Sequence, residues 1–436
     1  MTRETINIVG AGQCGTLMAL MLARHGYQVE VYERFRDPRI EDPEAGRSIN
    51  LALAARGLNA LRQVGIDALV QPLLVPMRGR MVHGEDGRTE FLPYGQQRDE
   101  EIYSVTRLGL NQILLGAADK LDNLNLNFEQ NAIGYDAPDQ YVHVRDERDG
   151  TLYQVAASPL IAADGAGSNI RRSFDGTGTF GGIENLLSHG YKELAIPAGP
   201  DGQFQLDPGA LHIWPRGGFM LIALPNPGGD FTLTLFLPNT GENSFEQLTD
   251  EQAVVSFFET NFPDAAALIP NLVEDVLDHP LGILGTVRCR HWHDRGNVLL
   301  VGDAAHAIVP FHGQGMNLAF EDCVLLDRII TELGSDWASV DAGHGARSQV
   351  CAAESAGVRT RATTAGAFHP AILDGHVPRR HPLPDRPAAR RTAESVARGV
   401  HGGCEHARGC RYRCRRAGDR APVAADRLGQ ERPVRS

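Results

Sequence analysis

Ile6-Asn-Ile-Val-Gly-Ala-Gly-Gln-Cys-Gly15 is the stretch of sequence that decides the fold. An apolar strand is predicted to run up to Gly10, and a helix is predicted to follow. Gly10 allows a tight turn, Gly12 lets phosphates approach the backbone, and Gly15 lets the helix pack closely on the strand. The N-terminus of the helix directs its dipole and free N–H groups toward those phosphates. The pattern predicts an α/β unit that holds a dinucleotide.

A second predicted strand, Gln28–Tyr32, ends at Glu33, about twenty residues beyond the glycines. A carboxylate at this point can accept hydrogen bonds from both hydroxyls of an adenosine ribose. The glycines alone would also fit a glycine-rich turn in an ordinary α/β core. The strand before them, the helix after them and the acid favour a site for an adenine dinucleotide.

Two more strand ends carry aspartates. The segment Leu160-Ile-Ala-Ala-Asp-Gly165 is predicted to be a buried strand that ends in a tight turn, although a plain strand–turn–helix link would look the same. The segment Asn297-Val-Leu-Leu-Val-Gly-Asp303 delivers Asp303 to a strand end, where a carboxylate can bind a ribityl hydroxyl.

The segment Pro310-Phe-His-Gly-Gln-Gly-Met-Asn317 precedes a helix predicted over Leu318–Leu333. The N-terminus of that helix would face the pyrimidine end of a flavin, where its dipole stabilises negative charge on the reduced ring. An NAD site needs no such feature. The predicted nucleotide is therefore FAD, bound tightly and without a covalent link.

The composition is that of a globular protein large enough for two domains, with 436 residues and 42% apolar side chains. The net charge of −12 is uneven, because residues 1–344 carry −22 and residues 345–436 carry +10. An acidic body argues against nucleic-acid binding. No apolar run is long enough to span a bilayer, and a first strand at Ile6 leaves no room for a signal peptide. The cysteines of residues 1–344 (Cys14, Cys289 and Cys323) show no disulfide pattern, which favours a cytoplasmic location.

The basic tail, residues 343–436, lacks apolar periodicity and is predicted to be irregular or disordered. It could be a disordered segment that binds an acidic partner. It could also be a small metal module, although the spacing lacks a CxxC pair; its candidate ligands are His401, Cys404, His406, Cys410 and Cys414. The third interpretation, which we favour, is a shifted reading frame in a GC-rich gene, because 18 arginines and no lysine follow Gly345.

The three strand-end motifs, in this order, resemble those of the group A flavoprotein aromatic hydroxylases. In that family the Asp-Gly motif contacts both FAD and NADPH, so the resemblance implies a shared role around Asp164. The family has no separate domain for NADPH, and this chain has no second GxGxxG motif.

A closer resemblance, over about residues 5–335, is to the kynurenine 3-monooxygenase family. It rests on Gly46-Arg-Ser-Ile-Asn-Leu-Ala-Leu53, Pro76-Met-Arg-Gly-Arg-Met81, Pro93-Tyr-Gly95, Tyr103-Ser-Val-Thr-Arg107, Gly190-Tyr-Lys-Glu-Leu194, Leu211-His-Ile-Trp-Pro-Arg216 and Gly302–Asn317. The resemblance implies hydroxylation of L-kynurenine to 3-hydroxykynurenine with FAD, NADPH and O2, a step of tryptophan catabolism.

The resemblance also implies a substrate site. Arg80 offers a planar fork for the α-carboxylate of kynurenine, and Tyr94 would add a hydrogen bond to the same group. Arg78 is the less favoured arginine. Phe311 and His312 would lie beside the substrate ring. Neither His312 nor His306 is assigned as a base, and no residue is assigned as a catalytic acid or a metal ligand.

The cofactor contacts that the resemblance implies come from all three motifs and from two intervening segments. They are Gly10, Gly12, Cys14 and Gly15 at the pyrophosphate, Glu33 and Arg34 at the adenosine, Ala52 and Arg107 at the flavin, Asp164 and Asp303 beside the nucleotide, and Gly315, Met316 and Asn317 along the isoalloxazine.

The implied fold is α/β: a Rossmann-like FAD-binding domain of the GR2 (PHBH) type with an inserted, mostly antiparallel substrate domain. The FAD-binding domain is predicted to take residues 1–75, 100–180 and 280–335. The substrate domain is predicted to take residues 76–99 and 181–279, with strands over Leu211–Trp214, Phe219–Leu224 and Phe231–Leu237.

The resemblance ends after the flavin helix. Members of the family continue into helices that cover the substrate and supply an asparagine and a tyrosine. Here no asparagine follows Gly343 and the only tyrosine is Tyr412. Two further hypotheses therefore stay open beside the kynurenine hydroxylase: an inactive flavin-binding remnant, and a hydroxylase of a modified kynurenine in secondary metabolism. The oligomeric state has no sequence signal.

Overall fold

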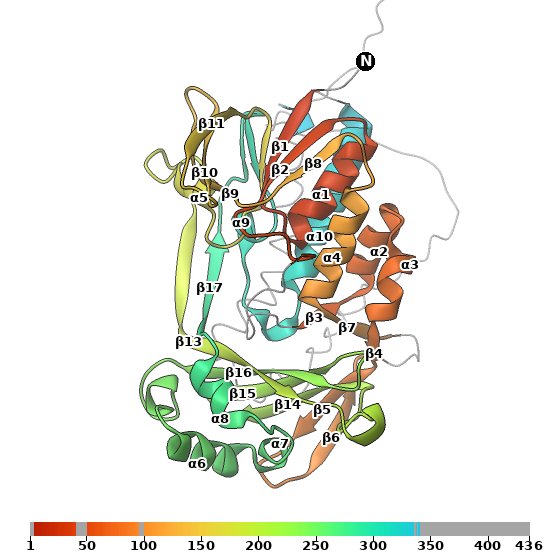
Figure 1. Cartoon of the computed structure of the whole chain (residues 1–436), viewed down its shortest axis with the longest axis vertical. Helices are drawn as coiled ribbons and strands as arrows, with labels where there is room; N and C mark the ends of the chain where they lie inside the picture. Colours follow the sequence, from red (N-terminus) through yellow and green to blue (C-terminus); the bar gives the residue numbers. More distant parts are fainter. Residues whose placement is uncertain (1–3, 41–49, 96–99, 335–336, 338, 341–436) are drawn as a thin grey trace, which may run out of the picture. The chain divides into compact units, whose positions relative to one another are not determined.

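The computed structural model describes residues 4–40, 50–95, 100–334, 337 and 339–340 (Figure 1). Every described residue belongs to one compact unit. The basic tail that we predicted to be irregular, together with its cysteines and histidines, lies outside the described residues.

A six-stranded sheet carries the glycine motif. Its order is β18 (His293–Asp294), β19 (Val298–Leu300), β12 (Leu160–Ala162), β1 (Thr5–Val9), β2 (Gln28–Tyr32) and β8 (Leu124–Asn127). All neighbours are parallel except β18 and β19. The three strand ends that the sequence marked, after β1, β12 and β19, therefore meet at one edge of one sheet. Ligands bind at this edge in open α/β sheets.

Alternate residues of these strands pack on opposite faces, as the pleat requires. Ile6 and Ile8 join one core with the helices, whereas Val9 joins a second core on the other face. The helices of the first core are α1 (Gln13–Arg24), α2 (Ala55–Gln63), α4 (Arg107–Ala118) and α10 (Gly315–Leu333), seen beside the sheet in Figure 1.

Two three-stranded sheets complete this part of the chain. β9 (Gln130–Asp136), β10 (Tyr141–Asp146) and β11 (Leu152–Ala156) are antiparallel and contribute Val142 and Val144 to the second core. The other sheet is formed by β3 (Asn50–Leu53), β7 (Ile102–Thr106) and β4 (Val75–Met77).

A seven-stranded sheet has the order β17 (Gly282–Arg288), β13 (Ile183–Ile196), β16 (Phe231–Pro238), β15 (Phe219–Pro225), β14 (Ala210–Arg216), β5 (Gly79–His83) and β6 (Thr89–Pro93). Its neighbours are antiparallel except β5 and β14. The three predicted strands are confirmed as β14, β15 and β16. β17, from a range that we predicted to belong to the FAD-binding domain, pairs with β13 in this sheet.

The two faces of the seven-stranded sheet differ in what covers them. Leu221 and Leu235 pack on one face against α6 (Glu251–Asn261), α7 (Pro263–Ala266) and α8 (Leu272–Asp278). On the other face, Met220 and Phe236 form a smaller core that includes Phe311. This second face therefore reaches the segment that precedes α10.

Helix α10 begins at Gly315, three residues before the predicted start at Leu318. The prediction was wrong because it read Gly315-Met-Asn317 as loop. In the structure the Asn317 side chain bonds neighbouring backbone and lies within the first turn. The remaining short helices are α3 (Asp67–Val70), α5 (Asn169–Arg172), α9 (Asp303–His306), η1 (Gln71–Leu73), η2 (Pro200–Gly202), η3 (Phe245–Gln247) and η4 (Pro310–His312).

Candidate active site at the junction of two sheets

The glycine motif forms a turn in which two of its glycines are sterically required. Gly10 has φ of +100°, and a Cβ there would lie 2.5 Å from the carbonyl oxygen of Ala163. A Cβ on Gly15 would collide with the carbonyl oxygen of Gly10. Gly12, the N-cap of α1, is different, because a Cβ there would meet no atom within 4 Å. Open space therefore lies beside Gly12, at a helix N-terminus that no side chain caps.

Glu33 braces this turn. Its Oε2 accepts a hydrogen bond from the backbone N–H of Ala11 at 2.7 Å, and its Oε1 accepts one from Phe35 at 3.0 Å. Each carboxylate oxygen keeps a lone pair for a further donor. The neighbouring Arg34 is exposed, and its guanidinium lies over the ring of Phe35 at 4.5 Å. The acid thus lies directly at the glycine turn, as the sequence predicted.

Asp164 follows β12 at the same edge of the sheet. Its Oδ2 accepts a hydrogen bond from the backbone N–H of Ile170 at 3.3 Å, while its buried Oδ1 has no partner among the described residues. Burial raises the pKa of this carboxyl, with the Ser168 hydroxyl acting against it. A buried oxygen without a donor is costly. The unsatisfied Oδ1 indicates a ligand that would donate to it.

Asp303 follows β19 and lies near the first turn of α10. The residue is exposed, yet desolvation raises the pKa of its carboxyl, with His306 and Arg107 acting against that rise. A Cβ on Gly315 would lie 3.9 Å from Oδ1 of Asp303. The structure therefore places Asp303, Arg107 and Gly315 close together.

Asn317 holds the segment around Ala52 against the start of α10. Its Nδ2 donates to the carbonyl oxygens of Ala52 at 2.8 Å and Gly313 at 3.1 Å, and its Oδ1 accepts from the N–H of Ala54 at 2.9 Å. The side chain is fully buried. A contact of Asn317 with a flavin would therefore come from its backbone. Its neighbour Met316 is half-buried and packs on the main core.

Cys14 points inward from the glycine motif. Its Sγ lies 3.8 Å from Sγ of Cys323 on α10. The contact with Cys323, together with burial, raises the thiol pKa of Cys14 well above its usual value. A thiol of raised pKa is a poor nucleophile. Cys14 packs α1 on α10, and a cofactor contact would come from its backbone.

These features fit a dinucleotide that carries a ribityl chain. The open space beside Gly12 suits a pyrophosphate, Glu33 suits a ribose, and the unsatisfied Oδ1 of Asp164 together with Asp303 suit further hydroxyl donors. The described residues include no group of three histidines, cysteines or acids arranged to hold a metal ion.

Arg80 and Tyr94 lie together on the seven-stranded sheet. Arg80 pairs in register with Leu92 and Leu211, and Leu211 belongs to the core that includes Phe311. The Arg80 guanidinium lies 5.5 Å from the centre of the Tyr94 ring. The buried Nε of Arg80 and the buried hydroxyl of Tyr94 both lack a hydrogen-bond partner within the described chain. Burial raises the pKa of Tyr94, with Arg80 acting against it.

Arg78, the less favoured arginine, has a different environment. Its side chain is 70% exposed and lies 4.0 Å from Glu101. Arg80 differs from Arg78 because its Nε is buried and has no hydrogen-bond partner among the described residues.

Phe311 and His312 belong to η4, between β19 and α10. The Phe311 ring packs edge-on against Phe236 of the sheet at 5.3 Å. Burial lowers the pKa of His312, and the Arg80 charge lowers it further. Arg80 therefore acts on both Tyr94 and His312, and His312 lies in η4, shortly before the start of α10.

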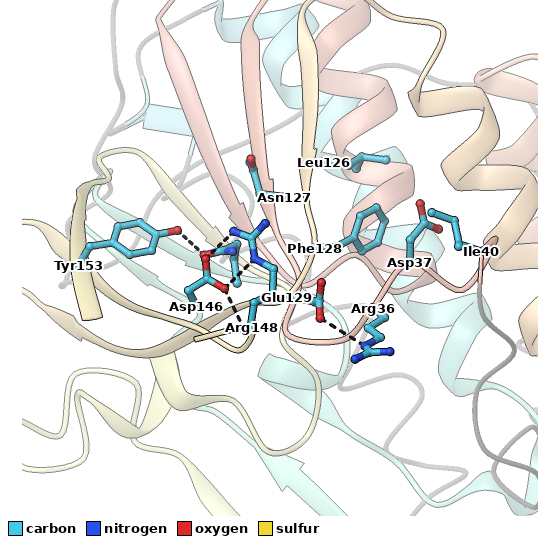
Figure 2. Close-up of a pocket in the computed structure, with 11 residues that line it drawn as sticks. Arg36, Asp37, Ile40, Leu126, Asn127, Phe128, Glu129, Asp146, Arg148 and Tyr153 are labelled. Atoms are coloured by element: carbon cyan, nitrogen blue, oxygen red, sulfur yellow. Dashed lines mark hydrogen bonds and ion pairs between the residues drawn. The ribbon is translucent and has the colours of Figure 1, made fainter. Parts of the chain in front are cut away.

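A separate recess of about 890 Å³ lies beside the end of β8 and strands β10 and β11 (Figure 2). Its charged side chains pair with one another: Arg36 lies 3.3 Å from Glu129, and Arg148 bonds Asp146. None of the predicted site residues lines it. The two arginines of the recess are therefore paired with acids of the recess, and the candidate site lies elsewhere.

Arg171 was not predicted. Its guanidinium, 2% exposed, donates to the carbonyl oxygens of Ala304 at 2.7 Å and Ala166 at 2.6 Å, and it also bonds the carboxylate of Glu184. It thereby joins the turn after Asp164 to the helix after Asp303. We also assigned no role from the sequence to Asp322 and His306, a buried hydrogen-bonded pair next to the turn that carries Asp303. Asp322 directly follows Glu321 on α10, so the local sequence did not single it out.

The fold has known counterparts. The profile of the family described as FAD binding domain matches residues 3–353 of the chain. The crystal structure of a 2-methyl-3-hydroxypyridine-5-carboxylic acid oxygenase mutant superposes with a TM-score of 0.65 at 21% identity, over 86% of this chain and 96% of that one. The protein belongs to the FAD binding domain family, in the fold of flavin monooxygenases.

Closer relatives share the sequence itself. Kynurenine 3-monooxygenase of Myxococcus xanthus (strain DK1622) is 46% identical over 338 residues, which are 78% of this chain and 73% of the relative. The enzyme of the same name from Xanthomonas euvesicatoria pv. vesicatoria (strain 85-10) is 48% identical over 324 residues, 74% of this chain and 71% of that one. Within its class, the chain belongs to the kynurenine 3-monooxygenase family.

Proposed function

We propose that this protein is an FAD-dependent monooxygenase that consumes NADPH and O2 and hydroxylates L-kynurenine to 3-hydroxykynurenine. Two observations together support the proposal, one from the sequence and one from the structure. The chain is 46% identical to a kynurenine 3-monooxygenase over 338 residues. It also holds two unsatisfied buried donors, Nε of Arg80 and the Tyr94 hydroxyl, and the charge of Arg80 acts on His312.

The residues that would hold FAD come from the edge of the six-stranded sheet. The backbone of Gly12 and the first turn of α1 would receive the pyrophosphate, and Glu33 would accept the ribose hydroxyls. Asp164 and Asp303 would accept further donors along the nucleotide. When bound, the flavin supplies hydride acceptance from NADPH and activation of O2. The protein supplies orientation, the charge at the start of α10 and exclusion of water.

Arg80 and Tyr94 would bind the α-carboxylate of the substrate. A guanidinium and a carboxylate form paired, charge-assisted hydrogen bonds, which are stronger than neutral ones. Arg80 is already desolvated on the strand that carries it, so less reorganisation is needed when the carboxylate arrives. The Tyr94 hydroxyl would donate to the same group from the residue that follows the adjoining strand β6.

Phe311 and His312 would bound the aromatic end of the substrate. Because burial and the Arg80 charge both lower the pKa of His312, the imidazole is neutral at pH 7. A neutral ring beside an aryl amine adds no competing charge. The edge-on packing of Phe311 on Phe236 fixes its ring, so both side chains would position the substrate without acting as an acid or a base.

We also infer which residues form each of the two domains. Residues 1–75, 100–180 and 280–335 would form the FAD-binding domain, and residues 76–99 and 181–279 the substrate domain, to which β17 adds a strand. NADPH would reach the flavin without a domain of its own. A cytoplasmic location fits the free thiols of Cys14, Cys289 and Cys323. Among the described helices none is long and apolar enough to cross a membrane.

Purified full-length protein tests the function. We expect visible absorbance of bound flavin, NADPH oxidation that L-kynurenine accelerates, and 3-hydroxykynurenine as the product identified by mass spectrometry. Formation of hydrogen peroxide without a hydroxylated product would contradict the proposal, and so would protein that retains no flavin in the presence of excess FAD.

A further inference from the structure

Asp322 lies on α10 and contacts the turn that carries Asp303. Its Oδ2 accepts a hydrogen bond from the backbone N–H of Gly302 at 2.9 Å and another from Nε2 of His306 at 2.6 Å. Asp322 is 5% exposed and His306 is 4% exposed. One buried carboxylate oxygen therefore holds both ends of the segment Gly302–His306, with Asp303 between them.

The segment needs such support because its backbone is unusual. Gly302 has φ of +57° and ψ of −137°, a conformation that few residues adopt. The ring of His306 stacks on Trp292, with 4.6 Å between ring centres and 25° between ring planes. Stacking fixes the ring plane, and the bond to Asp322 fixes its rotation. The orientation of Asp303 thus depends on a hydrogen bond from each side.

The pair also acts electrostatically on Asp303. Desolvation is the main cause that raises the pKa of the Asp303 carboxyl, and the negative charge of Asp322 adds to it while His306 opposes it. A second negative charge nearby disfavours ionisation of the Asp303 carboxyl. His306 bonds Asp322 directly.

We propose that Asp322 and His306 are positioning residues for FAD: through the N–H of Gly302 they set the direction in which Asp303 presents its carboxylate to the cofactor. The inference rests on the proposed function, because it takes FAD as the ligand of Asp303. Asp322 itself contacts no cofactor and acts only through the turn.

The test measures the dissociation constant of FAD for apoprotein made from the full-length chain, by quenching of flavin fluorescence. Asp322→Asn should weaken FAD binding by about 10- to 100-fold, the range for losing a buried hydrogen bond to a charged group. Asp327→Asn is the matched control. Asp327 lies on the same helix and also bonds a histidine, His25, at 2.9 Å, but it does not contact the turn. FAD affinity should be unchanged in that variant.

A double-mutant cycle separates positioning from general support. If Asp322 acts through Asp303, Asp303→Asn and Asp322→Asn together should weaken FAD binding no more than Asp303→Asn alone. Additive losses would show that Asp322 only stabilises the fold and would overturn the inference. An FAD affinity of Asp322→Asn within about twofold of the wild type would overturn it as well.

Variants of His306 give a second route that does not depend on the folding of Asp322→Asn. His306→Gln keeps an N–H near the position of Nε2 and should bind FAD nearly as well as the wild type, whereas His306→Leu should not. Equal affinities in these two variants would contradict the inference. Wild-type protein that binds no FAD would overturn the function and the inference together, whereas tight wild-type binding with an unchanged Asp322→Asn would overturn the inference alone.

Discussion

Nε2 of His83 lies 2.9 Å from Nδ1 of His212, inside the seven-stranded sheet. At one end of this pair, Nδ1 of His83 lies 2.9 Å from a carboxylate oxygen of Asp264. At the other end, Nε2 of His212 lies 2.9 Å from the carbonyl oxygen of Asp207. Both terminal oxygens accept, so three hydrogen bonds in series need three N–H groups. Two neutral imidazoles carry only two, and the pair therefore holds one positive charge.

Burial is the main cause that lowers the pKa of His212 to about 4, so this ring is neutral at pH 7 and accepts from His83. Burial alone would raise the pKa of Asp264, but hydrogen bonds from His83 and Trp214 lower it to about 2. Asp264, His83 and His212 thus form a hydrogen-bonded series, and His83 belongs to β5, the strand that also carries Arg80.

The lowered pKa of His212 predicts acid destabilisation. Folded His212 takes up its proton near pH 4, whereas the unfolded chain does so near pH 6.5, so the unfolded state binds more protons between these values. The free energy of unfolding should fall by up to about 3 kcal/mol as the pH drops through this window. Asp264 contributes later, because its stabilisation is lost only below its unfolded value of 3.8 as the pH approaches 2.

Urea unfolding at several pH values measures this slope. His212→Gln keeps an N–H for Asp207 and does not titrate, so its unfolding free energy should depend less on pH between 6.5 and 4. A variant with the same slope as the wild type would remove His212 as the source of the acid sensitivity.

Arg80→Ala should raise the KM for L-kynurenine by about 10- to 100-fold, because a charge-assisted hydrogen bond contributes roughly 1.5–3 kcal/mol. Arg78→Ala is the control, since Arg78 is two residues away and 70% exposed. Steady-state kinetics and substrate titration of the bound flavin absorbance measure both variants. Equal KM values in the two would place the carboxylate elsewhere.

Glu33→Ala should release FAD, because Glu33 both braces the N–H of Ala11 and is predicted to hold the ribose. We expect affinity to fall about tenfold or more. Glu30→Ala on the same strand is the control, since Glu30 bonds Asn125 and Asn127 at the surface. Full flavin occupancy of Glu33→Ala after gel filtration would contradict the ribose assignment.

Substitutions of Gly12 and Gly15 should have different effects on stability and on FAD binding. Gly15→Ala should destabilise the apoprotein by about 1–3 kcal/mol, because its Cβ would strike the carbonyl oxygen of Gly10. Gly12→Ala should leave the thermal midpoint of the apoprotein unchanged, since its Cβ meets no atom within 4 Å. It should still weaken FAD binding roughly tenfold, because the methyl group enters the space of the pyrophosphate. Unchanged FAD binding by Gly12→Ala would move the pyrophosphate away from this turn.

Local signals explain why much of the fold could be predicted. The strand predicted over Gln28–Tyr32 is β2 with the same bounds. The helix after Asn317 was placed correctly at its end, Leu333, but its start was three residues late. The error arose because the first turn is stabilised by Asn317 bonding Ala52, a contact with a residue far away in the sequence.

By itself the sequence determined the order of strands, turns and helices, the glycine turn and the choice of FAD, because these depend on residues close together along the chain. Only the tertiary structure decided that the Nε of Arg80 is buried whereas Arg78 is exposed, and that Asp322 supports the turn before Asp303. Sheet register and helix packing join residues that no local pattern connects, such as His83 and His212. The geometry of the site therefore follows from long-range packing, whereas the types of residue that form it can be recognised from short sequence motifs.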